Sequence, residues 1–402
     1  MEGNAPFDPE DGLTLEEGRL VALAFNPRLR IARLRLDRAQ VTALHSGVGE
    51  DPDLSLSLLR ITEATSDPWI INPGLTFTIP LSGRLGAERS HAAASQRAAE
   101  RRALEAEWDV SHDVRKAWAE WTAARLRVEE TERLLASMET LVETASRLAE
   151  TGEIQRTEAS LFTVDEARRR NRLLGLQGEE RAAEQRLRSH LGLAPEAPVT
   201  FLPFLEATRP VTATGDEISA RNPGLARLRL EYEVAEEGLR REIRKQIPDL
   251  HLGPQYESDE GQSRVGFLGG IPIPLLNANR KAIAEARVDR ELARAAFETE
   301  YELLVGRWAA ATAGVRALTE QRREMEEVLV PLIDRQLQDA LELLRLGEGK
   351  SLVLLESLTR AHEIKLELLE IRLRESLALA ELDHLIGPQP PERPFATTED
   401  TP

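Results

Sequence analysis

The chain has 402 residues, of which 41% are hydrophobic, 30% are charged and only 4% are aromatic, and it contains no cysteine. Abundant Ala, Leu, Glu and Arg with few rings are typical of long packed helices, because a narrow seam between helices favours small and aliphatic side chains. The formal net charge of -17 argues against nucleic-acid binding, which needs a basic surface. The lack of cysteine excludes disulfides, thiolate metal sites and cysteine nucleophiles.

No run of 18 consecutive apolar residues occurs, so the sequence predicts no transmembrane helix. The first residues, MEGNAPFDPEDG, lack the apolar core of a signal peptide. We expect that a leader has been removed from the native protein. The sequence leaves the native N-terminus and any lipid anchor open.

From residue 13 onward, the predicted elements are a short helix, a strand pair and two long helices joined at a glycine. Residues 52–58 read PDLSLSL, and the following WIINPGLTFTIPLS also alternates apolar with small or polar residues, which predicts a β-hairpin at about 52–82. Residues 85–148 contain no proline and have apolar residues mostly three, four or seven apart. A long helix pair is therefore expected over about 85–192, with its turn at Gly152.

The same landmarks return 194 to 196 residues later in the same order, which indicates a tandem duplication. Asn-Pro, Pro-Asp-Leu, Ile-Pro-Leu and Gly-Glu begin at 26, 52, 79 and 152 and again at 222, 248, 273 and 347. In the second copy, Pro331 is expected to kink the long helix. The predicted divisions are an N-terminal extension (1–12), a first repeat (13–193), a connector (194–215), a second repeat (216–387) with a hairpin at about 248–275 and a helix pair at about 279–386, and a C-terminal tail (388–402).

The predicted strands are about 9 to 12 residues long, which is the length that a tilted strand needs to cross a bilayer. Their apolar set suits lipid, and their small and polar set suits a water-filled lumen. Two hairpins cannot close a transmembrane barrel, so further chains would have to complete it. The predicted lipid-facing residues are Leu54, Leu56, Leu58, Leu75, Phe77, Ile79, Leu250 and Leu252.

In this order of elements the chain resembles the TolC family of outer membrane factors, in particular the cation-efflux branch of CzcC and CusC. The resemblance covers roughly residues 13–388. It rests on LTLEEGRLVALAFNPRLRIARLRLDRAQ and its echo ARNPGLARLRLEYEVAEEGLR, on PDLSLSL and PDLHLGP, on TFTIPLSG and GGIPIPLLN, and on LAETGEIQRTEASL and LRLGEGKSLVLLES. The fold it implies is mainly α with a small β part, a trimeric α-helical barrel continuous with a twelve-stranded transmembrane β-barrel of four strands per protomer.

The function that the resemblance implies is a passive homotrimeric channel in the outer membrane of a Gram-negative cell, with its helices in the periplasm. Such a channel would export small solutes or metal cations as part of a tripartite efflux system. Its implied partners are outer membrane lipid, a periplasmic adaptor protein and an inner-membrane pump of the RND or ABC type. Neither a cofactor nor nucleic acid is expected.

The resemblance also assigns roles to residues at the two helix turns. The turns at Gly152, Gly347 and Gly349 would contact the adaptor. The implied aperture residues are Glu158, Glu356, Glu153, Glu348 and Lys350. Where the family can have a further acid after the second glycine this chain has Val353, and Gly349 stands where an arginine would be expected.

Alternative functions remain open at this point. A soluble helical scaffold or adaptor, whose hairpins only cap helices, fits the charged helices taken alone. A type I protein-secretion exit duct would have the same architecture with another cargo. The seven histidines show neither paired nor HExxH spacing, and no nucleophile elbow or phosphate loop occurs, so neither a metal site nor an enzyme is predicted.

Overall fold

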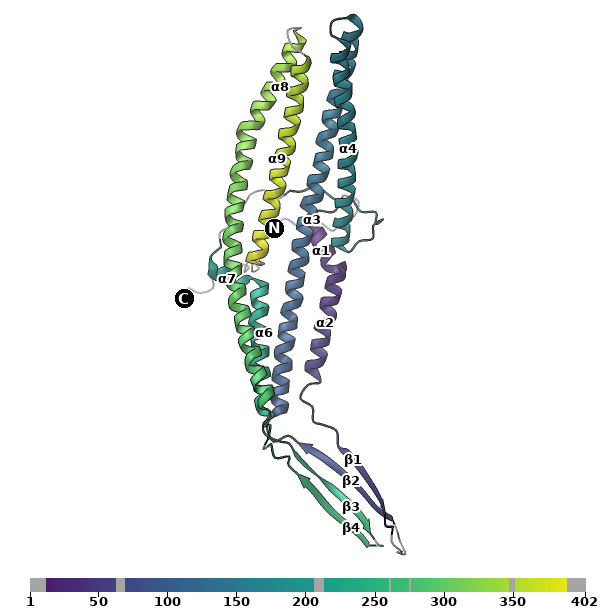
Figure 1. Cartoon of the computed structure of the whole chain (residues 1–402), viewed down its shortest axis with the longest axis vertical. Coiled ribbons are helices and arrows are strands. Elements are labelled where there is room, and N and C mark those ends of the chain that lie inside the picture. Colours follow the sequence, from purple (N-terminus) through teal and green to yellow (C-terminus); the bar gives the residue numbers. More distant parts are fainter. Residues whose placement is uncertain are drawn as a thin grey trace, which may run out of the picture. The chain divides into compact units, whose positions relative to one another are not determined.

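The computed structural model describes the protein over residues 12–62, 69–205, 213–259, 262–274, 276–346 and 351–388. The helices are α1 (Leu15–Phe25), α2 (Pro27–Leu44), α3 (Arg84–Thr151), α4 (Arg156–Leu191), α5 (Gly215–Arg221), α6 (Pro223–Arg244), α7 (Arg280–Glu324), α8 (Val330–Arg345) and α9 (Ser351–Ile386), with a π-helical turn at Met325–Leu329. The strands are β1 (Asp53–Arg60), β2 (Trp69–Ile79), β3 (Leu250–Asp259) and β4 (Gln262–Gly270). The protein is thus mainly helical with a small sheet (Figure 1).

The four strands form one antiparallel sheet in the order β1-β2-β3-β4. The two predicted hairpins are joined by pairing between β2 and β3, in which Phe77 lies opposite Leu252 and Ile79 opposite Leu250. In the first hairpin, Leu54 lies opposite Leu75. Alternation in the sequence predicted each hairpin, and the pairing of β2 with β3 joins them into one sheet.

The chain divides into two compact units, one formed by residues 1–30, 106–222 and 303–402, the other by 31–105 and 223–302. The second unit contains the sheet and a layer of helices in the order α2, α3, α6 and α7 (Figure 1). Ion pairs cross this layer, such as Arg102 to Glu231 (2.7 Å) between α3 and α6. Among the described residues, no helix has an apolar stretch long enough to span a bilayer.

The first unit has its main core where α1, α3 and α4 meet. Trp118 is fully buried there, packs edge-on against Phe201 at 5.4 Å between ring centroids, and donates its indole N–H to the Leu202 carbonyl (3.0 Å). The guanidinium of Arg188 lies over the Phe201 ring, 5.3 Å from its centroid. Such ring packing stabilises a core beyond the area it buries.

The landmarks of the two sequence copies make matched contacts in this unit. The amide of Asn26 donates to the His190 carbonyl (2.7 Å), and that of Asn222 donates to the Leu385 carbonyl (2.9 Å). Each helix that precedes these asparagines begins with a Thr-x-x-Glu capping box, at Thr14 and at Thr214. These equivalent contacts support the inference of a tandem duplication.

Candidate aperture at the helix turns

The turn between α3 and α4 is built around Gly152, which has a φ of 82°. The N–H of Glu153 donates to the Leu148 carbonyl (2.9 Å) and that of Gly152 donates to the Ala149 carbonyl (3.4 Å), the two hydrogen bonds of a Schellman motif. The exposed Glu153 carboxylate accepts a hydrogen bond from the Thr151 hydroxyl (3.3 Å). The predicted turn glycine therefore ends α3 by a known mechanism and places an acid at the tip.

Glu158 lies in the first turn of α4, where the helix dipole favours a negative charge. It is half-buried, and its Oε1 accepts a hydrogen bond from the Ser351 hydroxyl at the start of α9 (2.8 Å). The predicted aperture acid of the first copy is therefore attached to the second helix pair. Nothing in the sequence indicated Ser351 as its partner.

Glu356, the acid of the second copy, differs from Glu158 in its surroundings. Its side chain is 69% exposed and pairs with Arg360 one turn later on α9 (3.0 Å). The remaining predicted turn residues, Gly347, Glu348, Gly349 and Lys350, lie outside the described residues. The structure thus brings Glu158, and not Glu356, into the contact between the helix pairs.

A second contact joins α4 to α9 further from the turn. Arg169 of α4 donates from Nη2 to the Thr359 hydroxyl (3.0 Å) and from Nε to Asp165 (3.2 Å). His362 lies one turn after Thr359 and is 6% exposed. Burial, followed by the charges of Arg169 and Lys365, lowers the pKa of His362 to about 4. The spacing of the histidines in the sequence did not indicate that His362 would be buried here.

The strand register gathers all the predicted lipid-facing residues on one face of the sheet. Residues directly opposite each other in an antiparallel pair share a face, and side chains alternate along each strand. Leu54 is thereby joined to Leu75, Phe77 to Leu252 and Ile79 to Leu250. Leu54, Leu56 and Leu58 are between 57% and 79% exposed, which is unusual for so many neighbouring large apolar residues.

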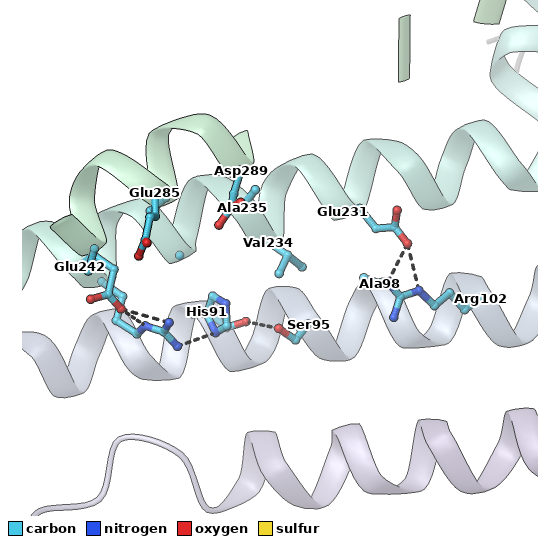
Figure 2. Close-up of a pocket in the computed structure, with 14 residues that line it drawn as sticks. His91, Ser95, Ala98, Arg102, Glu231, Val234, Ala235, Glu242, Glu285 and Asp289 are labelled. Atoms are coloured by element: carbon cyan, nitrogen blue, oxygen red, sulfur yellow. Dashed lines mark hydrogen bonds and ion pairs between the residues drawn. The ribbon is translucent and has the colours of Figure 1, made fainter. Parts of the chain in front are cut away.

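A cavity of about 610 Å³ lies among α3, α6 and α7 in the second unit (Figure 2). Its polar side chains contact one another, as Arg241 does with Glu242 (3.1 Å) and with His91 (3.5 Å). The Ser95 hydroxyl donates to the His91 carbonyl within α3 (2.9 Å). Within the described ranges, no three His, Asp or Glu side chains form a group that could hold a metal ion.

Comparison with known proteins connects these features to one family. The family model for outer membrane efflux proteins matches residues 21–193. No curated protein sequence matches the chain. Among solved structures, the outer membrane protein VceC from Vibrio cholerae is 20% identical with a TM-score of 0.78, over 93% of this chain and 96% of that one.

Two further structures show the same fold over most of their length. CusC is 16% identical, with a TM-score of 0.78 over 93% of this chain and 92% of CusC. A membrane protein from Pseudomonas aeruginosa is also 16% identical, with a TM-score of 0.80 and the same coverage. Residues 21–193 therefore match the outer membrane efflux protein family, and the chain as a whole has the fold of these outer membrane channel structures.

Proposed function

We propose that this protein is the outer membrane channel of a tripartite efflux system, a passive homotrimeric conduit for small solutes or metal cations. The observation that carries the proposal is that both sides of the sheet-and-helix unit are unpartnered in the single chain. One side is formed by β1 and α2, and the other by β4 and α7 (Figure 1). A single kind of contact between copies would complete both sides at once.

The sheet needs such a contact because β1 and β4 are edge strands. Open edges are not tolerated in hydrocarbon, since each unpaired N–H or carbonyl there costs several kcal/mol. Pairing β1 of one copy with β4 of the next removes every edge when the ring closes. Three copies would give the twelve strands that the family resemblance implies, with the apolar face of the sheet toward lipid.

The helices at the two sides have matching unpartnered faces. In α2, half-buried Ala32, Leu36 and Ala39 pack inward, and in α7 Ile283, Ala286 and Ala293 do the same. Residues two positions before or after such a stripe are rotated by about 200°, which places them on the opposite side of the helix. The residues found there are exposed and apolar: Leu34 and Val41 on α2, and Val288 on α7. Leu292, one turn after Val288 on α7, is also exposed.

Hydrogen bonds between neighbouring helices of the layer indicate which residues of α2 and α7 lie at the same height along the helix axes. They are the hydrogen bonds from Arg89 to the Gly47 carbonyl (2.8 Å), between Arg241 and His91 (3.5 Å), and from Asn279 to the Glu242 carbonyl (2.8 Å). Because Gly47 and Asn279 share a level and the helices are antiparallel, Leu34 comes level with Leu292. Arg38 then lies within one turn of Glu285, whose charge is opposite.

The remaining parts of the proposed function concern the helix turns. Gly152, Gly347 and Gly349 would contact a periplasmic adaptor, and an inner-membrane RND or ABC pump would supply the energy. Glu158, Glu356, Glu153 and Glu348, with Lys350, would surround the aperture. A ring of three carboxylates at a pore attracts cations and binds them weakly enough for conduction. We place the strands in the outer membrane and the long helices in the periplasm.

Conductance is the test of this proposal. Purified full-length protein added to a planar bilayer should produce discrete current steps, because a closed ring would be open to water along its axis. A protein that stays monodisperse without detergent and produces no current would refute the channel function. Such a result would favour the helical scaffold.

Cross-linking tests the seam between copies separately. The chain has no cysteine, so Leu34→Cys with Leu292→Cys should form intermolecular disulfides that give dimers and closed trimers on a non-reducing gel. The matched control is Leu34→Cys with Lys281→Cys, which lies three turns off level and should cross-link poorly. Equal cross-linking of both pairs would contradict the proposed register.

A further inference from the structure

His362 lies on α9 one turn after Thr359, whose hydroxyl accepts a hydrogen bond from Arg169 of α4. Ser351 and Thr359, which bond to Glu158 and Arg169 of α4, precede it on α9. The ring is almost fully enclosed, and its Nδ1 has no hydrogen-bond partner among the residues that the structure describes. A buried imidazole without a partner for its proton is tolerated only in the neutral form.

The charges that face His362 make protonation still less favourable. From α4, Arg169 contributes a positive charge, with Asp165 held on it at 3.2 Å. On α9, Lys365 lies one turn further on and contributes a second positive charge, with Asp334 of α8 at 3.5 Å. A proton on His362 would therefore add a positive charge near those of Arg169 and Lys365.

We propose that the α4–α9 contact is an acid-sensitive latch, which is held together while His362 is neutral and loosens when its imidazole gains a proton. Loosening would separate Glu158 from Ser351 and free the first turn of α4. Only the consequence for ion flow rests on the proposed channel function. The separation of the two helices can be tested without it.

The size of the effect follows from the two states of the ring. In the packed contact the pKa of His362 is about 4, whereas a hydrated imidazole has a pKa of about 6.5. Between these values the separated state binds more protons, so lowering the pH favours separation. At pH 5.5 the ratio of packed to separated contacts should fall about tenfold relative to pH 7.5 or above.

The distance between α4 and α9 can be measured directly because the native chain has no cysteine. Leu161→Cys on α4 and Leu352→Cys on α9 replace side chains that are 53% and 43% exposed, and both can carry nitroxide labels. Double electron–electron resonance on full-length protein, diluted with unlabelled native chain, should show longer and broader distances at pH 5.5 than at pH 7.5. His362→Gln should give the same distances at both pH values.

The matched control is His112→Gln. His112 is a half-buried histidine of the same unit whose pKa is also lowered to about 4, but it lies on α3 and contacts His384 and Glu381. This variant should keep the native acid response. An acid response that persists in His362→Gln, or that is absent from the native chain, would overturn the latch.

A second variant keeps the test valid if His362→Gln does not fold, which its circular dichroism would show. Lys365→Met removes one of the two positive charges and should reduce the lengthening seen at pH 5.5. An undiminished response in Lys365→Met would also overturn the latch. A distance change without any bilayer current would support the latch and refute the channel instead.

Discussion

The long helix of the first copy is continuous, whereas its counterpart in the second copy is interrupted. α3 runs for 68 residues without a break, but α7 ends at Glu324, and a π-helical turn precedes α8. The difference lies at Pro331, because proline has no N–H to donate and its ring clashes with the carbonyl four residues earlier. The position 195 residues before it is Ala136. A wider turn before the proline accommodates both defects.

The interrupted helix is held to α9 by charged groups near the break. Glu375 of α9 is 1% exposed and accepts hydrogen bonds from Thr319 (2.8 Å) and Arg322 (2.7 Å). Glu326, inside the π-helical turn, is bound by Arg372 of α9 (2.6 Å). These contacts hold α7 and the π-helical turn against α9 just before the proline.

Moving the proline to the first copy is expected to have the largest effect. Ala136→Pro should lower the free energy of unfolding by about 3 kcal/mol or more, because α3 has no π-helical turn to accommodate the ring. The site is exposed, so lost side-chain packing would not contribute. Thermal unfolding in detergent, followed by circular dichroism, measures the effect.

Ala136→Gly is the control for that substitution, with an expected cost of about 1 kcal/mol. The reverse change, Pro331→Ala, should be tolerated, since an alanine can donate to the Glu327 carbonyl in an ordinary α-helix. A cost for Ala136→Pro no greater than that for Ala136→Gly would show that α3 is not intrinsically less tolerant of a break.

The second comparison concerns the glycines that end α4 and α9. Gly192 (φ of 74°) and Gly387 (φ of 93°) are equivalent, and a Cβ on either would lie 2.4 Å from a backbone carbonyl oxygen, of Phe25 and of Arg221. Replacement by alanine should cost about 3 kcal/mol in each copy, from the left-handed backbone and the clash together. If the copies are equivalent, Gly192→Ala and Gly387→Ala should lower the free energy of unfolding by similar amounts.

Gly152→Ala is the matched control, because Gly152 has a φ of 82° but open space around its Cβ position. Only the left-handed backbone should then contribute, at about 1 kcal/mol. A loss as large as that of Gly192→Ala would indicate a contact at the turn beyond the backbone conformation.

Acid should weaken both copies through one histidine each, the half-buried His112 and the buried His362. Burial lowers the pKa of His112 to about 4, with the neighbouring His384 as the next cause. Because the unfolded chain has a pKa near 6.5, it binds more protons than the native state between these values, and stability falls as the pH decreases. Through His112 alone, the free energy of unfolding should be about 2 kcal/mol lower at pH 5 than at pH 7.

His112→Gln should remove about this much of the pH dependence, measured as the difference in unfolding free energy between pH 7 and pH 5. His362→Gln should remove a similar amount in the second copy. The exposed His45 is the control, and His45→Gln should leave the pH profile as in the native chain. A native profile that is flat between pH 5 and 7 would contradict both assignments.

The contrast between the copies also shows what could be predicted from sequence. The apolar spacing and the turn glycine predicted the long helices around Gly152, and alternation predicted the strands and the face that Leu54 and Phe77 share, because these patterns are local. Pro331 predicted a kink but not its π-helical form. Ser351 and His362 could not be assigned partners, since heptad spacing identifies the packed face of a helix but not the helix that packs against it.

The smallest expected effects concern Glu158 and Glu356, the two proposed aperture acids, which the structure places in unlike surroundings. Glu356→Gln should lower cation preference slightly, because Arg360 already neutralises part of the exposed carboxylate and water screens the rest. Glu158→Gln should lower it more, since the half-buried carboxylate is bonded to the neutral Ser351 and, among the described residues, to no cation. Reversal potentials in a planar bilayer under a salt gradient measure both changes. Equal shifts would mean that exposure, rather than pairing, determines how each acid acts on passing cations, and no shift in either variant would remove both from selectivity.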